Sequence, residues 1–232
     1  AHSASMARSN CMTRARAWSR SCVTAARAAR SERSTSISSS TSSKLGALLN
    51  ELTDADLSLK AFPFSSGQWH SLANTNVLML RITYVGELGW ELYLPAEHCL
   101  DVYERLLEAG APLGMLHAGY HAMGACRVEK GYKHWSHDIG DEDTPLDAGL
   151  GFTVAWDKPG GFVGRDALLA LKAAGPLQRR LVQVMLDDAS DTAPLLYHDE
   201  PLVRAGIIVG SIRSGAWGHR LSRSIGMGYV SC

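Results

Sequence analysis

The stretch from Arg81 to Pro95 contains two runs of alternating residues joined by a turn, and it constrains the fold more than any other part of the chain. It reads R-I-T-Y-V-G-E-L-G-W-E-L-Y-L-P. Period two is the pattern of half-buried strands, and Gly86 and Gly89 bracket the reversal, so the sequence predicts an antiparallel hairpin. The residues expected to share one face of each strand are Leu80, Ile82 and Tyr84, and then Trp90, Leu92 and Leu94.

Glu91 is the candidate binding residue of this hairpin. Because side chains alternate along a strand, Glu91 points away from Trp90 and Leu92, and Tyr84 lies across the turn from it. A carboxylate beside a tyrosine on rigid strands suits a planar heterocycle with two parallel N–H donors, since one carboxylate can accept both. The alternative is a solvent-facing acid without a ligand, and spacing alone leaves that alternative open.

The N-terminal segment, residues 1–44, has a composition that cannot form a core. It holds thirteen serines and seven arginines, and its eight Lys/Arg residues face one acid, whereas the rest of the chain has 15 basic and 22 acidic residues. Such a segment cannot bury enough apolar surface to offset the ordering of its backbone, so we expect a disordered tail. An organelle transit peptide, a flexible linker and an artefactual tail remain alternatives. Without interleaved aromatic residues, the basic charge does not predict nucleic-acid binding.

From Leu45 onward, apolar residues recur with helical and strand periods. Leucines from Leu45 begin a helix, and further helices are expected at 97–109, 117–130 and 165–174, with Leu100, Tyr103, Leu106 and Leu107 on one face of the first of these. Strands are expected at 152–156, 181–186, 201–204, 207–209 and 225–230. The sequence therefore predicts an α+β fold. An antiparallel sheet with packed helices occupies residues 45–175, and a small, incomplete antiparallel β-barrel occupies residues 176–232.

Motifs for other chemistries are weak or missing. His117, His121, His134, His137 and Asp138 could in principle bind zinc, but the H-E-x-x-H pattern is absent and solvated histidines explain them equally, so we assign no metal site. No G-x-S-x-G elbow or phosphate-binding glycine loop occurs, so we assign no catalytic residue, and a flavin or nicotinamide domain must lie elsewhere. The five cysteines form no C-x-x-C pair, and no run of 18 apolar residues predicts a membrane span.

Five motifs in order resemble one family. They are T-Y-V-G-E-L-G-W-E-L-Y-L-P, G-Y-H-A-M-G-A-C-R-V-E-K-G-Y-K-H-W-S-H-D-I, T-P-L-D-A-G-L-G-F, F-V-G-R-D-A-L and S-I-G-M-G-Y-V. Together they resemble the folate-binding aminomethyltransferases of the glycine cleavage T-protein family, and most closely the C-terminal part of flavin-dependent sarcosine and dimethylglycine dehydrogenases. The resemblance implies tetrahydrofolate as the cofactor. It places the family's pterin-binding glutamate at Glu91 and its accompanying tyrosine at Tyr84.

The sequence also departs from the family's pattern. Met123 stands where T-proteins have an arginine, as expected for the dehydrogenase branch. The segment with the family's folate-positioning aspartate has no counterpart in residues 1–44, and a later folate-binding arginine would follow Tyr229-Val230. We therefore expect a fragment, inactive alone, that comprises the second lobe and a truncated barrel.

The function implied by the resemblance is a one-carbon transfer domain of a flavin-dependent sarcosine or dimethylglycine dehydrogenase. The alternatives are a regulatory homologue similar to the pyruvate dehydrogenase phosphatase regulatory subunit, and a glycine cleavage aminomethyltransferase. The expected partners are folate, an N-methylated glycine derivative and a flavin-dependent oxidoreductase domain that carries FAD, with no nucleic acid or membrane. The expected location is the mitochondrial matrix in a eukaryote, or the cytoplasm in a bacterium.

Overall fold

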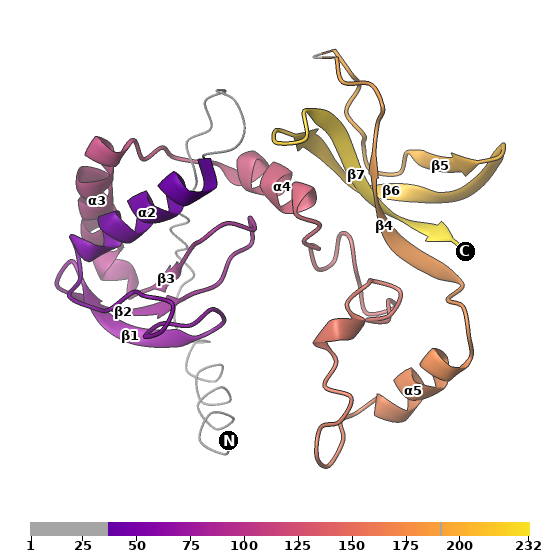
Figure 1. Ribbon diagram of the computed structural model, residues 1–232, viewed down its shortest axis with the longest axis horizontal. Helices are drawn as coiled ribbons and strands as arrows, with labels where there is room; N and C mark the ends of the chain where they lie inside the picture. Colours follow the sequence, from indigo (N-terminus) through magenta and orange to yellow (C-terminus); the bar gives the residue numbers. More distant parts are fainter. Residues whose placement is uncertain (1–36, 191) are drawn as a thin grey trace. The chain divides into compact units, whose positions relative to one another are not determined.

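The computed structural model describes residues 37–190 and 192–232 and divides into two compact units (Figure 1). The first unit ends at Gly119 and the second comprises Tyr120–Cys232. Most of the predicted tail, residues 1–36, lies outside the described residues. Residues 37–44 are helical and form the first part of α2 (Ile37–Asn50), so this helix begins before the leucine pattern that starts at Leu45. The domain boundary predicted at residues 175 and 176 stays a prediction.

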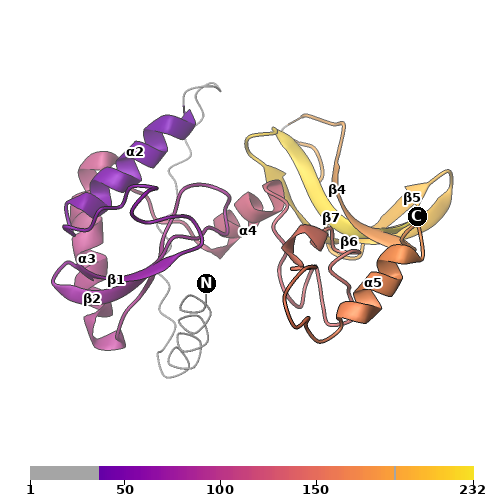
Figure 2. The ribbon, with the colours of Figure 1, turned by 60° about the horizontal axis from the view of Figure 1, so that its bottom comes forward.

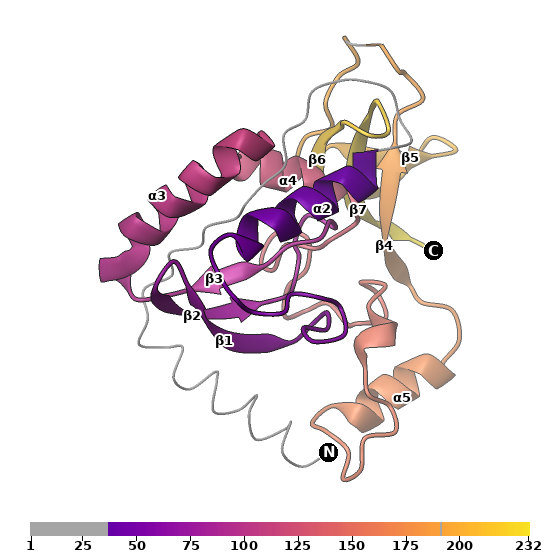
Figure 3. The same cartoon turned by 60° about the vertical axis from the view of Figure 1, so that its left-hand side comes forward.

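The first unit is an antiparallel sheet with two helices on one face. Its elements after α2 are β1 (Gly67–Leu72), β2 (Thr75–Leu80), β3 (Glu91–Tyr93), η2 (Ala96–His98), α3 (Cys99–Gly110) and η3 (Ala111–Leu113). Both strand pairs are antiparallel, in the order β1-β2-β3. Figure 3 shows α2 and α3 on the same side of this sheet. The core they enclose includes Leu48, Leu49, Leu72, Val77, Met79, Leu92, Val102 and Leu106.

The predicted hairpin exists, but its first strand ends earlier than the sequence predicted. β2 stops at Leu80, residues 81–90 form a loop, and Leu80 pairs with Glu91. The buried face of β2 carries Val77 and Met79, so the prediction that Leu80, Ile82 and Tyr84 form its apolar face was wrong. Arg81 follows on the same face and is only 8% exposed, because its guanidinium donates to the carbonyls of Leu57 (3.1 Å) and Phe62 (2.7 Å).

The helix predicted at residues 97–109 is confirmed as η2 followed by α3, but one residue of its predicted buried face is misplaced. Leu100 is 66% exposed, whereas Val102 and Leu106 are buried. Val102 and Leu106 are four positions apart and therefore share one face of the helix, which is the face that packs on the core. The helix predicted at 117–130 is α4 (Tyr120–Glu129), and it ends before Gly131, whose φ of 70° is left-handed.

The second unit contains a four-stranded antiparallel sheet in the order β4-β7-β6-β5 (Figure 2). Its elements after α4 are η4 (Gly151–Thr153), α5 (Arg165–Ala173), β4 (Arg179–Met185), β5 (Pro201–Arg204), β6 (Ile207–Gly218) and β7 (Arg223–Ser231). Val128 of α4 packs against Ile225 and Met227 of β7. The α+β class is thus confirmed, and the sheet of the barrel domain is not closed within the described residues.

Two predictions in the second unit were wrong. Residues 152–156 do not form a strand: η4 occupies their start, the Thr153 amide bonds the Leu150 carbonyl at 2.9 Å, and Phe152 is 84% exposed. β6 extends to Gly218, far beyond the predicted 207–209. A Cβ added at Gly210 would lie 1.8 Å from the Tyr229 carbonyl oxygen, so glycine in this strand permits close approach to β7 and does not mark a loop.

Candidate functional site

The outer face of the first sheet, opposite the core, carries both Glu91 and a row of apolar side chains. In the strand register, Trp69 lies opposite Leu78 and Leu78 opposite Tyr93. The next row on the same face is Gly67, Leu80 and Glu91. Trp69 is 51% exposed and the side chains of the two leucines, Glu91 and Tyr93 are half-buried. This outer sheet face therefore offers an apolar surface with one carboxylate at its edge.

The Glu91 carboxylate is held by a tyrosine of its own strand. The Tyr93 hydroxyl donates to Glu91 Oε2 at 2.5 Å, which is in the range of short bonds between a hydroxyl and an ionised carboxylate. The two residues share one face because they are two positions apart in a strand, while Leu92 between them is buried. An ionised carboxylate has about four lone-pair positions, and the Tyr93 hydroxyl needs only one, so the group retains the capacity to accept paired N–H donors.

Tyr84, the other predicted site residue, lies in the 81–90 loop and is half-buried. The hydrogen bond to Glu91 is donated by the Tyr93 hydroxyl. The loop around Tyr84 is shaped by Thr83, whose hydroxyl accepts hydrogen bonds from the amides of Val85 (3.2 Å) and Gly86 (3.1 Å). A role for Tyr84 in binding stays a prediction. Tyr93 was missed as a site residue, although the E-x-Y spacing on one strand face was visible in the sequence.

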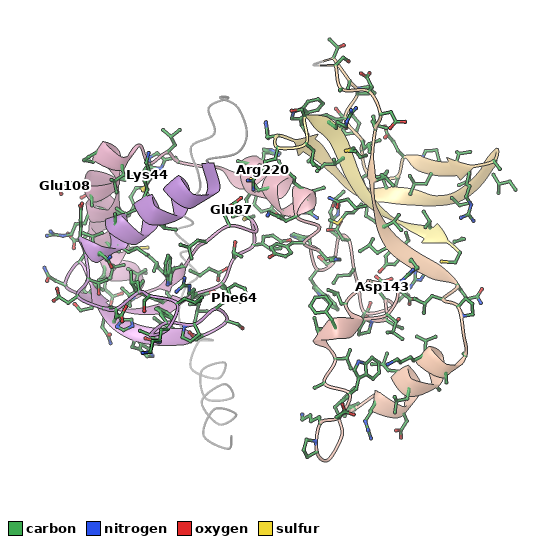
Figure 4. All side chains as sticks on the ribbon, viewed as in Figure 1. Lys44, Phe64, Glu87, Glu108, Asp143 and Arg220 are labelled. Carbon is green, nitrogen blue, oxygen red and sulfur yellow. The ribbon has the colours of Figure 1, made fainter. Side chains whose placement is uncertain are left out.

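Arg81 and Trp90 close the base of this loop. The Arg81 guanidinium lies over the Trp90 ring, 5.1 Å from its centroid, and the Trp90 ring meets Phe62 at 6.4 Å in an edge arrangement. The Arg81 backbone is also fixed, because its amide donates to the Ser66 carbonyl at 3.0 Å. A cation over an indole face contributes about 0.5–2 kcal/mol. The two ends of the loop are therefore anchored in the core, one residue before Glu91. The loop carries Glu87, which is labelled in Figure 4.

An open groove of about 530 Å³ lies elsewhere in the same unit. It is bordered by the end of α2 and by the β1–β2 turn, and residues such as Thr53, Asp54, Asn74 and Arg105 line it. Glu91 and Tyr84 do not belong to its lining. The predicted binding residues therefore lie on a sheet face and not in this groove.

The second unit contains a buried polar network that joins α4 to the loop after it and to β6. Arg127 pairs with the carboxylate of Asp138 and also donates to the Ser214 hydroxyl at 2.7 Å, and that hydroxyl in turn donates to Asp138. The His134 amide donates to the same carboxylate at 2.8 Å. All three side chains are nearly inaccessible, and Asp138 is 1% exposed. Because Asp138 accepts bonds from all three neighbours, the network fixes the loop and offers no reactive group.

Three of the four histidines considered for a metal site, His117, His134 and His137, make other contacts, and His121 is exposed. His117 lies before α4 and its Nδ1 is 3.0 Å from the Tyr103 hydroxyl. His134 Nε2 is 3.2 Å from the Tyr120 hydroxyl, and the ring of His137 stacks on His198 with centroids 5.0 Å apart. Within residues 37–190 and 192–232, no three His, Cys, Asp or Glu side chains are grouped in a way that could hold a metal ion.

Burial is the main cause that lowers the pKa of His137, and the neighbouring Asp138 carboxylate partly opposes it. The positive charges that His198, Arg127 and His134 can carry lower this pKa further. In β7, burial is likewise the first cause that raises the pKa of the Tyr229 hydroxyl, followed by the Asp143 carboxylate. Both groups therefore stay neutral in the folded chain near neutral pH. In the part of the chain that the structure describes, no helix has the length and apolar character needed to cross a membrane.

Two family models match the chain. The model described as "GCVT N-terminal domain" matches residues 43–158, and the model described as "Glycine cleavage T-protein C-terminal barrel domain" matches residues 179–232. The crystal structure of the glycine cleavage system aminomethyltransferase T from Bartonella henselae has a similar fold, with a TM-score of 0.63 and 25% identity. That match covers 82% of this chain and 48% of the other.

Curated relatives are more similar in sequence but much longer. The 4-methylaminobutanoate oxidase (formaldehyde-forming) of Paenarthrobacter nicotinovorans is 43% identical over 180 residues, which are 78% of this chain and 21% of the relative. The mitochondrial sarcosine dehydrogenase of Homo sapiens is 42% identical over 184 residues, which are 79% of this chain and 20% of the relative. The chain thus spans about a fifth of the length of these two relatives.

Proposed function

The chain belongs to the glycine cleavage T-protein family, and on that premise we propose that it is the tetrahydrofolate-binding, one-carbon transfer part of a flavin-dependent sarcosine or dimethylglycine dehydrogenase. Identity above 40% to an oxidase and a dehydrogenase over nearly four fifths of the chain supports this branch of the family. Met123 supports it as well, because the T-proteins of glycine cleavage carry an arginine in this part of α4.

The observation that carries the proposal is the Glu91 carboxylate on the outer sheet face. The pterin ring of folate is planar, and one edge carries an amino group and a ring N–H that point in the same direction. A carboxylate accepts such a pair in a forked arrangement, which adds orientation to affinity. Tyr93 uses one lone-pair position of Glu91, and the remaining positions suit this edge. Trp69, Leu78 and Leu80 supply an apolar surface for the flat ring beside it.

The residues of this chain would contribute binding and orientation. Glu91 holds the pterin edge, and the Arg81–Trp90 contact fixes the loop that ends next to Glu91. The apolar side chains of the outer sheet face exclude water from the bound ring. When bound, tetrahydrofolate would supply the nucleophilic nitrogens that take up the one-carbon unit. Holding two reactants in place removes much of the entropic cost of their meeting, so no side chain of this chain needs to act as acid, base or nucleophile.

The oxidation that generates the one-carbon unit belongs, in this proposal, to a flavin domain outside the chain. The substrate would be an N-methylated glycine derivative. In a eukaryote we place the protein in the mitochondrion, where the human sarcosine dehydrogenase is found. If genomic sequence upstream of residue 45 continues in frame into a G-x-G-x-x-G segment, the proposal is supported, because this motif binds the dinucleotide part of FAD.

A glycine cleavage aminomethyltransferase is the second candidate, because the solved aminomethyltransferase of that system has a similar fold over 82% of this chain. In that case the upstream sequence would encode a further T-protein lobe and no dinucleotide-binding motif. Met123, which is half-buried in α4, argues against this candidate.

Calorimetric titration of the 232-residue chain with 5-formyltetrahydrofolate, a stable reduced folate, tests the proposed ligand. We expect binding that is weakened about 5- to 150-fold by Glu91→Gln, because the amide presents N–H groups to N–H donors and leaves them poorly paired. Glu108→Gln on α3, an exposed glutamate labelled in Figure 4, is the matched control and should bind like the unchanged chain. Equal affinities for the two variants would remove the role given to Glu91.

A further inference from the structure

The bond between Tyr93 and Glu91 connects two residues of the same short strand. β3 is only three residues long, and both partners project from its outer face. A hydrogen bond within one strand joins no two elements of the fold, so it adds little to tertiary structure. Its effect is local: it restricts the torsion angles of the glutamate side chain.

We infer that Tyr93 is a positioning residue for the Glu91 carboxylate and fixes it in the orientation that binds a planar N–H donor edge. The inference rests on the proposed function and assigns a role to a residue that the family resemblance did not include. The hydroxyl occupies Oε2, so Oε1 and the remaining lone pair of Oε2 are the atoms that meet the ligand.

The tyrosine is suited to this role because it is itself held. Leu78 lies directly opposite Tyr93 in the register, and Trp69 lies opposite Leu78 on the adjacent strand, so the phenol ring is part of a cross-strand row. A tyrosine has two side-chain torsions, whereas a glutamate has three and loses more rotamer entropy when it is fixed. Orienting the carboxylate before the ligand arrives removes part of this cost from binding.

The hydroxyl also sets what the carboxylate can recognise. The carboxylate is an acceptor, and because the Tyr93 hydroxyl donates its hydrogen bond to Oε2, it too presents only an acceptor oxygen to a ligand. A pteridine edge with an amino group and a ring N–H matches this pattern, and an edge without the amino group offers one donor fewer. Tyr93 should therefore matter for the amino-bearing edge and not for the rest of the ligand.

The test compares Tyr93→Phe with the unchanged 232-residue chain and two ligands, 5-formyltetrahydrofolate and its 2-desamino analogue. We expect Tyr93→Phe to weaken the first ligand about 2- to 13-fold, the usual cost of immobilising one rotamer-rich side chain on binding, and to change the second less than about twofold. Tyr103→Phe is the matched control: it also removes a tyrosine hydroxyl bond in the first unit, the one to His117, and should change neither ligand. Equal losses for both ligands in Tyr93→Phe would show a merely structural role and overturn the inference.

A readout without ligand separates this inference from the proposed function. With ¹³C-labelled glutamate, the carboxyl resonance of Glu91 should move in Tyr93→Phe and stay in place in Tyr103→Phe. An unchanged resonance would show that the bond does not hold the carboxylate in solution, whatever the affinities are. A shifted resonance in a chain that binds neither ligand would confirm the bond, refute the proposed function, and with it overturn the positioning role toward folate.

Discussion

The buried network of Arg127, Asp138 and Ser214 makes a sharp prediction about stability. Replacing Arg127 with Met removes the ion pair to Asp138 and the donor to Ser214, while the carboxylate stays at 1% exposure. Breaking a buried pair on one side leaves an uncompensated charge and costs about 3–5 kcal/mol. That is a large part of the total stability of a small domain. We therefore expect Arg127→Met to destabilise the second unit severely.

A second ion pair of the same unit provides the comparison. Arg179 and Asp143 are 2.8 Å apart, but their side chains are 40% and 13% exposed, so solvent screens the pair. Arg179 also stacks over the Tyr229 ring at 4.8 Å. Arg179→Met should therefore cost about 1–2 kcal/mol, the sum of a screened pair and a partly exposed cation–π contact.

Urea titration followed by hydrogen exchange of the β6 and β7 amides would measure both variants, because this readout reports on the second unit alone. The double variant Arg127→Met with Asp138→Leu removes both charges and should be more stable than Arg127→Met by about 2 kcal/mol. If Arg127→Met cost no more than Arg179→Met, or if the double variant were the least stable, the account of the network as a buried, mutually dependent set would be refuted.

Further predictions concern a strand glycine, a helix glycine and a histidine. Gly210→Ala should unpair β6 from β7 and lower the melting temperature sharply, because the added Cβ would lie 1.8 Å from the Tyr229 carbonyl oxygen. Gly124→Ala should stabilise α4 by about 0.5–1 kcal/mol, because a Cβ added there has no neighbouring atom within 4 Å. Burial lowers the pKa of His137 below 6.5, so the unfolded chain binds more protons than the folded chain as the pH falls from 7 to 5. The free energy of unfolding should therefore decrease over this range, and His137→Gln should reduce that slope in urea titrations at several pH values.

The sequence predicted the class of fold and most helices because their signals are local. α3, α5 and β5 follow from apolar spacing and from the glycines and prolines beside them. β6 was mostly missed because Gly210 and Gly215 resemble loop residues, and only the distance to facing backbone atoms reveals why they are glycine. Such distances depend on residues far along the chain, which a local pattern cannot contain.

The candidate site was predicted in part for a similar reason. Strand alternation correctly placed Glu91 on the face of β3 that Leu92 does not share, and the burial pattern of β3 confirms this. Its tyrosine neighbour Tyr93 could have been found from the E-x-Y spacing, whereas the position of Tyr84 in a loop depends on where β2 ends. The buried face of β2 continues into Arg81, a charged residue whose buried position depends on the carbonyls of Leu57 and Phe62. Charge suggests exposure, so the sequence alone gave no sign of this burial.

The Arg81–Trp90 contact makes the loop between them an exchangeable segment. Both ends of the loop are fixed by core contacts, so a change in the length of residues 82–89 need not move β3. Doubling the length of a flexible loop costs only about 0.6 kcal/mol of closure entropy. A protein engineer could therefore vary or graft this segment while Glu91 keeps its place, and related proteins could diversify this loop by the same route.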